Sequence, residues 1–289
     1  MFMKHHFADF LIREGDYWTI IPNRERYAHK IDNLSSDSAD VSVITIEGGD
    51  ENWERVLDLP NLVELTLHQP TEQQMQVASK LVKLKRLRVT HARPKNLSFI
   101  SPLERIEELV LEYVSGFSDL SPLRSLRKLK SLHLENLRRV SRFDGLSGIE
   151  TLRYLMIDGT LDWKQPIEDF IFLKGLPRLE VLRFGGVITK AKFPALLPPI
   201  SLKHLKEIKV AWNVFSAEEY ALLEVGLPHV KGACRGPFTR FKHSGSQECF
   251  EFTGKGAGRV KCDHPDSKSK CAKYAELYES LKVRAKAFL

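Results

Sequence analysis

Aliphatic residues recur between residues 41 and 210 at a spacing that fits neither an α-helix nor a simple alternating strand. The stretch LKSLHLENL, residues 129–137, places its leucines at relative positions 0, 3, 5 and 8, whereas one face of a helix needs positions 0, 3, 4 and 7. Leu132 and Leu134 are two residues apart, so on a strand they share a face, and His133 between them points to the other face. The pattern therefore predicts a short strand with one apolar face inside each such unit.

The same unit, LxxLxL, occurs eight times along the chain. Successive matches begin 21, 22, 22, 23, 23, 27 and 26 residues apart. One strand cannot bury its leucines alone, but strands stacked about 4.8 Å apart share a continuous apolar column. Eight such strands predict a parallel sheet that is about 35 to 40 Å long. The matches begin at Val41, Leu62, Leu84, Ile106, Leu129, Leu152, Leu179 and Leu205.

With this period and motif, the chain resembles the leucine-rich repeat family from Val41 to about Val230. The resemblance implies an α/β fold: a curved solenoid with a parallel sheet, returns that are helical, 3₁₀ or extended, and protein binding on the concave face. The chain departs from the family at the position where an asparagine side-chain amide usually forms hydrogen bonds with the backbone groups inside the turn. Other loop bonds or water must satisfy those backbone groups here. That position holds Pro70, Ala92, Val114, Leu137, Thr160, Val187 and only once an asparagine, Asn213.

The return segments carry helix signals of uneven strength. Residues 71–74 and 216–219 match capping boxes, and each predicts the start of a helix. Pro166 near the start and Gly175 at the end bracket a further predicted helix in the longest repeat. Elsewhere, Ser-Pro pairs as in GFSDLSPLRSL predict short 3₁₀ or extended returns.

Charge and cysteine content divide the chain near residue 231. Residues 1–230 contain 31 basic and 31 acidic residues, whereas residues 231–289 contain 13 and 6 and all four cysteines. We therefore predict an N-terminal cap over 1–40, a solenoid over 41–235 and a basic, cysteine-containing region over 236–289. The last region predicts a small α+β cap, with short strands around a glycine turn and a helix over 267–288. The apolar face of that helix holds Tyr274, Leu277, Tyr278, Leu281, Ala285 and Phe288.

The C-terminal region permits three sharper interpretations besides a cap with free thiols. The sequence GKGAGR can cradle a phosphate through backbone amides, although it lacks the Walker spacing. Zinc binding and a disulfide are the other two, although no CxxC pair anchors a metal site and a reducing compartment disfavours a disulfide. The soft ligands for zinc are Cys249, Cys262, His264 and Cys271.

Other function classes find little support in the sequence. The first 16 residues interrupt any apolar run with charges, so the sequence predicts neither a signal peptide nor a membrane span, and a cytoplasmic protein is expected. Paired catalytic carboxylates, a nucleophile elbow and a metal-binding helix are not recognisable. We therefore expect no catalysis, no cofactor and no metal.

The strand positions between the leucines form columns across the concave face. Glu112, Glu135 and Asp158 fall in successive strands, where like charges repel unless a cation or a basic partner lies over them. Aromatic, methionine and arginine side chains beside such a ridge are typical interface anchors. The candidate partner-binding residues are Arg86, Arg88, Glu108, Glu112, His133, Glu135, Tyr154, Met156, Asp158 and Arg183.

Two alternatives compete with this interpretation. The exposed strand positions can simply be charged to keep the sheet soluble, and the basic residues before the strands, such as Arg127, Lys128 and Lys130, then belong to a solvated convex face. The basic C-terminal region can instead attract nucleic acid, although its lysines are scattered around a helix that also has an apolar face, so a solvated cap explains them as simply. We favour a non-catalytic scaffold whose partner is an unidentified protein with basic residues at the contact, with nucleic acid as the less favoured partner.

Overall fold

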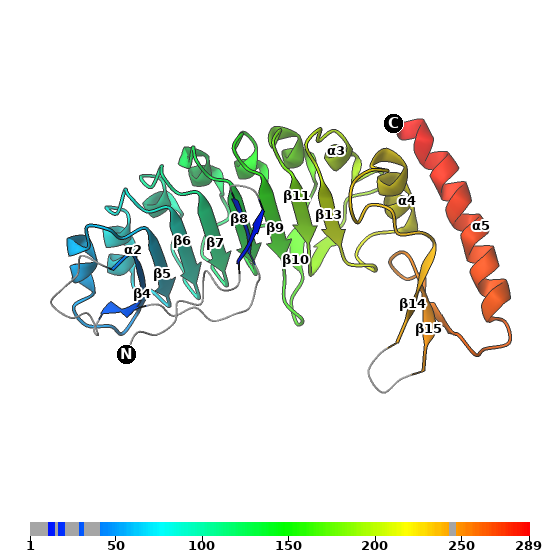
Figure 1. The fold of residues 1–289 in the computed structure, drawn as a ribbon, viewed down its shortest axis with the longest axis horizontal. Coiled ribbons are helices and arrows are strands. Elements are labelled where there is room, and N and C mark those ends of the chain that lie inside the picture. Colours follow the sequence, from blue (N-terminus) through cyan, green and yellow to red (C-terminus); the bar gives the residue numbers. More distant parts are fainter. Residues whose placement is uncertain (1–10, 15–16, 21–28, 32–40, 243–246) are drawn as a thin grey trace.

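A parallel sheet of nine strands forms the body of the protein and follows an arc (Figure 1). The computed structural model describes residues 11–14, 17–20, 29–31, 41–242 and 247–289. The strands lie in the order β13-β11-β9-β8-β7-β6-β5-β4-β3, so the strands of consecutive repeats are neighbours in the sheet. Their bounds are β3 His29–Lys30, β4 Val43–Glu47, β5 Glu64–His68, β6 Arg86–Thr90, β7 Glu108–Glu112, β8 Ser131–Glu135, β9 Tyr154–Asp158, β11 Val181–Phe184 and β13 Glu207–Val210.

The eight predicted strands are confirmed, each at its LxxLxL match. Every strand pairs with the next at the same repeat position, so Leu132 of β8 lies beside Leu109 of β7 and Leu155 of β9. All three side chains are 0 % exposed. The leucine columns therefore form one core, as the requirement for shared burial predicts.

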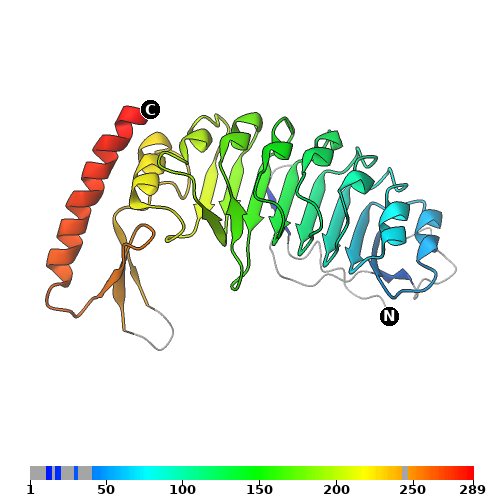
Figure 2. The ribbon, with the colours of Figure 1, turned by 180° about the vertical axis from the view of Figure 1, so that it is seen from behind.

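The returns opposite the sheet are mostly 3₁₀ helices (Figure 2). The Ser-Pro returns are confirmed as 3₁₀, and Thr71 caps α2 with the full capping box, Gln74 N–H donating to Thr71 Oγ1 at 3.1 Å. The return elements are η2 Trp53–Asp58, α2 Glu72–Ala78, η3 Ser98–Ile100, η4 Ser121–Ser125, η5 Asp144–Leu146, η6 Ile171–Gly175, α3 Leu197–Ile200 and α4 Ala217–Gly226.

One predicted capping box and one predicted return helix need correction. Helix α4 does begin after Ser216, but the capping box is not formed: the Ser216 side chain makes no capping bond, and the Glu219 carboxylate accepts from the N–H groups of Ala195 and Leu196, at 2.7 and 2.9 Å. The segment that begins near Pro166 is not a helix but a strand, β10 (Gln165–Ile167), which pairs with β12 (Val187–Thr189). The predicted helix shrinks to the 3₁₀ turn η6, which does end at Gly175.

Glutamine side chains make part of the hydrogen bonds that asparagines make in other leucine-rich repeats. The buried side chain of Gln165 accepts a hydrogen bond from Leu137 N–H at 2.9 Å and donates one to the carbonyl of Val140 at 2.7 Å. Gln74 likewise donates to the carbonyl of Glu47 at 2.9 Å. The turns are thus satisfied by amide groups from other places in the chain, as the backbone requirement demands.

The C-terminal region packs a helix and a small sheet beside the last repeat (Figure 1). Helix α5 (Ser267–Ala285) lies against α4 and is followed by η7 (Lys286–Phe288). The antiparallel strands β14 (Phe238–Phe241), β15 (Cys249–Phe252) and β16 (Arg259–Lys261) confirm the predicted hairpin. Tyr278 and Leu281 of the predicted apolar face are buried, whereas Leu277 is 49 % exposed and so lies outside the packed face.

A short N-terminal hairpin lies over the opposite side of the sheet from the leucine core. Strands β1 (Leu11–Glu14) and β2 (Tyr17–Ile20) pair with each other, and β2 contacts β8 and β9 (Figure 1). The remainder of the predicted N-terminal cap, apart from residues 29–31, lies outside the described residues. Among the helices that the structure describes, none combines the length and the apolar character that a membrane crossing requires.

Candidate functional site

The candidate residues lie together on the face of the sheet opposite the leucine core, which we call the concave face. The register places Glu112 of β7 beside Glu135 of β8, and Glu135 beside Asp158 of β9. Alternation along each strand then keeps every such side chain on this face. The predicted row of carboxylates in successive strands is therefore confirmed.

Arginines on the same face neutralise one carboxylate of this row, Glu112, and two glutamates beside it, Glu64 and Glu108. Arg88 Nε donates to Glu112 Oε2 at 2.9 Å, and neither residue is more than 8 % exposed. Arg86 lies between Glu64 and Glu108, with guanidinium-to-carboxylate distances of 2.6 and 3.1 Å. Burial by itself lowers the pKa of Arg86, but the charges of Glu64 and Glu108 outweigh it and raise that pKa. The cation beside Glu112 thus comes from the chain itself.

His133 and the two glutamates beside it form a buried cluster. His133 Nε2 lies 3.3 Å from Glu135 Oε2, and both residues are 0 % exposed. Glu112, His133 and Glu135 each bring one potential ligand atom within 4.8 Å of the others. Metal ions need such groups with free lone pairs, but the guanidinium of Arg88 already contacts Glu112 Oε2. As arranged here, the cluster fits an arginine as counter-ion better than a metal ion.

The remaining candidates continue the network toward the C-terminal strands. Tyr154 and Met156 pack with Val181, and Tyr154 Oη donates to Met156 Sδ at 3.4 Å. The guanidinium carbon of Arg183 lies 5.6 Å from the centroid of the Tyr154 ring. Arg183 also donates to Glu207 Oε1 at 3.0 Å. Asp158 accepts a hydrogen bond from the backbone N–H of Gly186.

The expectation that these side chains stand free in solvent is wrong. Only Arg86, Asp158 and Arg183 are half-buried. Over β8 and β9 the second strand of the β1–β2 hairpin packs on this face. On β6 and β7 the side chains pack against one another in ion pairs, as Arg88 does with Glu112 and Arg86 with Glu108. The other candidates, Arg88, Glu108, Glu112, His133, Glu135, Tyr154 and Met156, are at most 8 % exposed.

A sequence signal for this hairpin exists in the stretch LIREGDYWTI. The pair Gly15-Asp16 separates two runs rich in strand-forming residues, and a Gly-Asp pair in that setting is typical of a two-residue hairpin turn. The motif lies outside the repeats. The repeat pattern therefore gave no reason to look for a strand pair there.

The structure also tests the disulfide, phosphate and zinc interpretations of the C-terminal region. All four cysteines are free thiols, so a disulfide is not formed. The glycine-rich turn is poorly suited to a phosphate, because its backbone amides donate internally, Gly254 N–H to Trp212 O at 3.1 Å and Lys255 N–H to Phe215 O at 2.6 Å. Over the described part of the chain, the zinc candidates Cys249, Cys262, His264 and Cys271 do not form a metal-ligand cluster.

The arrangement of strands decides the fold class. Each LxxLxL match contributes one strand to a continuous parallel sheet, and each return lies on the side of the leucine core. The chain has the leucine-rich repeat fold. Comparison with protein-family models finds no match, and no curated protein matches the chain either.

Comparison with solved structures finds leucine-rich repeat proteins at low sequence identity. An internalin C2 from Listeria monocytogenes is 23 % identical, with a TM-score of 0.44, over 58 % of this chain and 70 % of that chain. An internalin F from the same organism is 20 % identical, with a TM-score of 0.43, over 63 % and 57 %. A leucine-rich repeat protein of Leptospira interrogans is 14 % identical, with a TM-score of 0.36, over 63 % and 58 %. This chain spans less than two thirds of the last two proteins.

Proposed function

We propose that this leucine-rich repeat chain is a non-catalytic scaffold for protein–protein interaction, and that its concave face binds polypeptide. The observation that carries the proposal is the β1–β2 hairpin, because its second strand packs on β8 and β9. That sheet face already holds an extended segment of its own chain. A segment of similar shape from a partner can occupy the same place when the hairpin leaves.

The side chains under the hairpin support this role. Met156 and Tyr154 provide apolar and aromatic area, and Arg183 lies over the Tyr154 ring. Such residues contribute most of the binding free energy in protein interfaces when they are fully desolvated. The ion pair between Arg88 and Glu112 fixes both side chains before a partner binds, so binding requires little additional ordering of these side chains.

The free thiols support the expectation of a reducing, cytoplasmic location for this scaffold. Each carboxylate of the acidic row on the concave face already has a partner within the chain: Arg88 for Glu112, His133 for Glu135 and the backbone N–H of Gly186 for Asp158. A partner on this face is therefore selected by shape and apolar contact more than by a strong basic charge. This replaces the basic partner that the sequence pattern alone favoured.

The proposal is tested with a labelled synthetic peptide of residues 9–22 and two forms of the protein, the full chain and a chain that lacks residues 1–22. The peptide should bind the shortened chain. It should bind the full chain with an affinity at least about tenfold lower, because the tethered hairpin competes at a high effective concentration. A scrambled peptide is the matched control. A cooperative thermal transition of the shortened chain shows that it is folded.

Two substitutions locate the peptide on the sheet. Met156→Lys on the concave face should weaken binding to the shortened chain, whereas Ile171→Lys on η6, where the side chain is 63 % exposed, should not. In the full chain, Met156→Lys should also speed proteolysis within the first 20 residues. Equal effects of the two substitutions in both measurements would exclude the concave face as the binding surface.

A further inference from the structure

A second charged surface lies at the edge of the sheet where the strands begin. The residue just before the first repeat leucine is Lys128, Thr151, Arg178 or His204 in four successive repeats. Because the strands pair at equal repeat positions, these side chains follow one another along this edge, about 4.8 Å per strand. They belong to the loops that enter the strands and not to the convex side.

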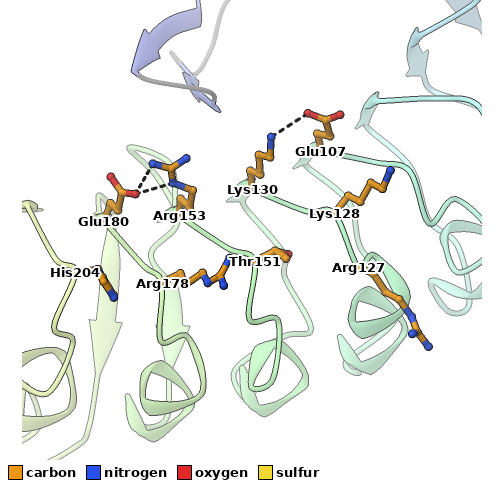
Figure 3. Close-up of a pocket in the computed structure, with 9 residues that line it drawn as sticks. All are labelled: Glu107, Arg127, Lys128, Lys130, Thr151, Arg153, Arg178, Glu180 and His204. Carbon is orange, nitrogen blue, oxygen red and sulfur yellow. Dashed lines mark hydrogen bonds and ion pairs between the residues drawn. The ribbon is translucent and has the colours of Figure 1, made fainter.

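These loops enclose an open groove of about 700 Å³. Figure 3 shows the side chains that line it, which come from the loops that enter β7, β8, β9, β11 and β13. Five of the lining side chains are basic and two are acidic, which leaves an excess of three positive charges. The lining consists of Glu107, Arg127, Lys128, Lys130, Thr151, Arg153, Arg178, Glu180 and His204.

Ion pairs account for both acidic side chains of the groove. Arg153 Nε donates to Glu180 Oε1 at 2.6 Å, and Lys206 Nζ donates to Glu180 Oε2 at 2.5 Å. Lys130 Nζ lies 3.4 Å from Glu107 Oε2. The groove has no carboxylate left for the other lining cations.

Three exposed cations therefore remain available on this surface. Arg127, Lys128 and Arg178 form no ion pair with any residue that the structure describes. Figure 3 shows Arg178 extended toward Thr151, and Lys128 and Arg127 on the neighbouring loop. Thr151 holds the position between Lys128 and Arg178, so the cations are spread along the groove. A ligand with several negative groups can pair with them without displacing an ion pair.

The chemistry of the groove favours carboxylates on a polypeptide over a nucleic acid. Surfaces that bind single-stranded nucleic acid interleave cations with aromatic rings on which bases stack, and the lining includes no phenylalanine, tyrosine or tryptophan. Glu107 and Glu180 also interrupt the row of cations, which disfavours an evenly charged phosphate backbone. An acidic peptide can place its separate carboxylates on the cations and leave the two glutamates uncontacted.

We propose that this groove, between the loops that enter β7, β8, β9, β11 and β13, is a binding site for an acidic segment of a partner protein. The groove lies on the edge of the sheet and not on the concave face, so the proposal does not depend on the function proposed above. It assigns a binding role to basic residues that the sequence pattern placed on a solvated surface. The recognition is electrostatic, and its affinity falls as the salt concentration rises.

The test uses the full chain and two labelled probes of equal charge, an oligoglutamate peptide and an oligothymidylate, each with about ten negative groups and followed by fluorescence anisotropy. The groove variant is Lys128→Glu with Arg178→Glu. The control variant is Lys268→Glu with Lys273→Glu, which makes the same charge change at exposed positions of α5. Unchanged thermal transitions establish that both variants are folded, and Lys128→Gln with Arg178→Gln is the milder groove variant.

We expect the peptide to bind the unmodified chain at about 50 mM salt and to weaken toward 200 mM. The groove variant should lose affinity about tenfold or more, the glutamine variant less, and the α5 variant should bind as the unmodified chain does. Tighter binding of the oligothymidylate than of the peptide would overturn the assignment to an acidic protein. Binding that is absent at low salt, or that only the α5 variant loses, would overturn the groove as the site.

Discussion

The ion pair between Arg88 and Glu112 gives the sharpest test of whether the concave face is closed to water. Arg88 is 8 % exposed and Glu112 is 4 % exposed, and both lie on the concave face, on β6 and β7. Replacing Arg88 by Met keeps most of the side-chain volume but removes the charge. Glu112 then stays in the interior beside Glu135 without its guanidinium.

The expected loss in the free energy of unfolding is about 3 to 5 kcal/mol, which is typical when one partner of a buried ion pair is removed. Coulomb's law gives a consistent value, because unit charges about 4 Å apart attract by about 4 kcal/mol at an effective dielectric constant of 20. An exposed pair would change stability by about 1 kcal/mol or less.

Urea denaturation followed by circular dichroism measures this difference. Arg127→Met at an exposed position is the matched control and should change stability little. The double variant Arg88→Met with Glu112→Gln should recover most of the loss, because no buried charge then lacks a partner. If Arg88→Met costs no more than Arg127→Met, the pair is solvated, and the burial of the concave face at β6 and β7 is refuted.

Three further predictions concern the core, the turns and the pH response. Leu132→Ala should lower the free energy of unfolding by about 2 to 5 kcal/mol because its side chain is 0 % exposed, whereas Lys128→Ala should change it little; equal losses in urea titrations would contradict the strand assignment. Gln165→Leu should cost about 1 to 3 kcal/mol for each backbone group left without a partner; the same titration measures it, and an unchanged midpoint would show that water replaces the amide. Burial alone raises the pKa values of Glu180 and Glu207, but bonds from basic side chains outweigh it and lower them. Their stabilisation is therefore present above about pH 4.5 and is lost as pH falls through the lowered pKa values; thermal midpoints that do not fall below that pH would contradict it.

The repeat pattern was sufficient to predict the sheet from sequence. Each strand is short and has little stability alone, but LxxLxL leaves only one arrangement that buries every leucine. Register follows as well, because a shift of one residue would move Leu132 out of the core and His133 into it. The 3₁₀ returns at Ser-Pro pairs and the strands of the C-terminal hairpin depend on local signals of the same kind.

The errors arose where a contact joins residues far apart in the chain. The sequence around Ser216 matches a capping box, but Glu219 binds the backbone of Ala195 and Leu196 instead. Gln165 lies in a stretch that resembles a helix start, yet its amide bonds with Leu137 and Val140 and the segment pairs as a strand. A local motif does not specify which of two partners is nearer in the folded chain.

The sequence by itself determined the repeat, the parallel sheet and which residues share its two faces, because these follow from the alternation of side chains along a strand. Only the tertiary structure decided how much of the face opposite the leucine core is exposed to solvent. The β1–β2 hairpin lies over the concave face, where arginines neutralise neighbouring glutamates, while exposed cations without ion pairs gather on the loops that enter the strands. Burial and pairing of charges depend on contacts between distant segments, so no local pattern could have revealed them.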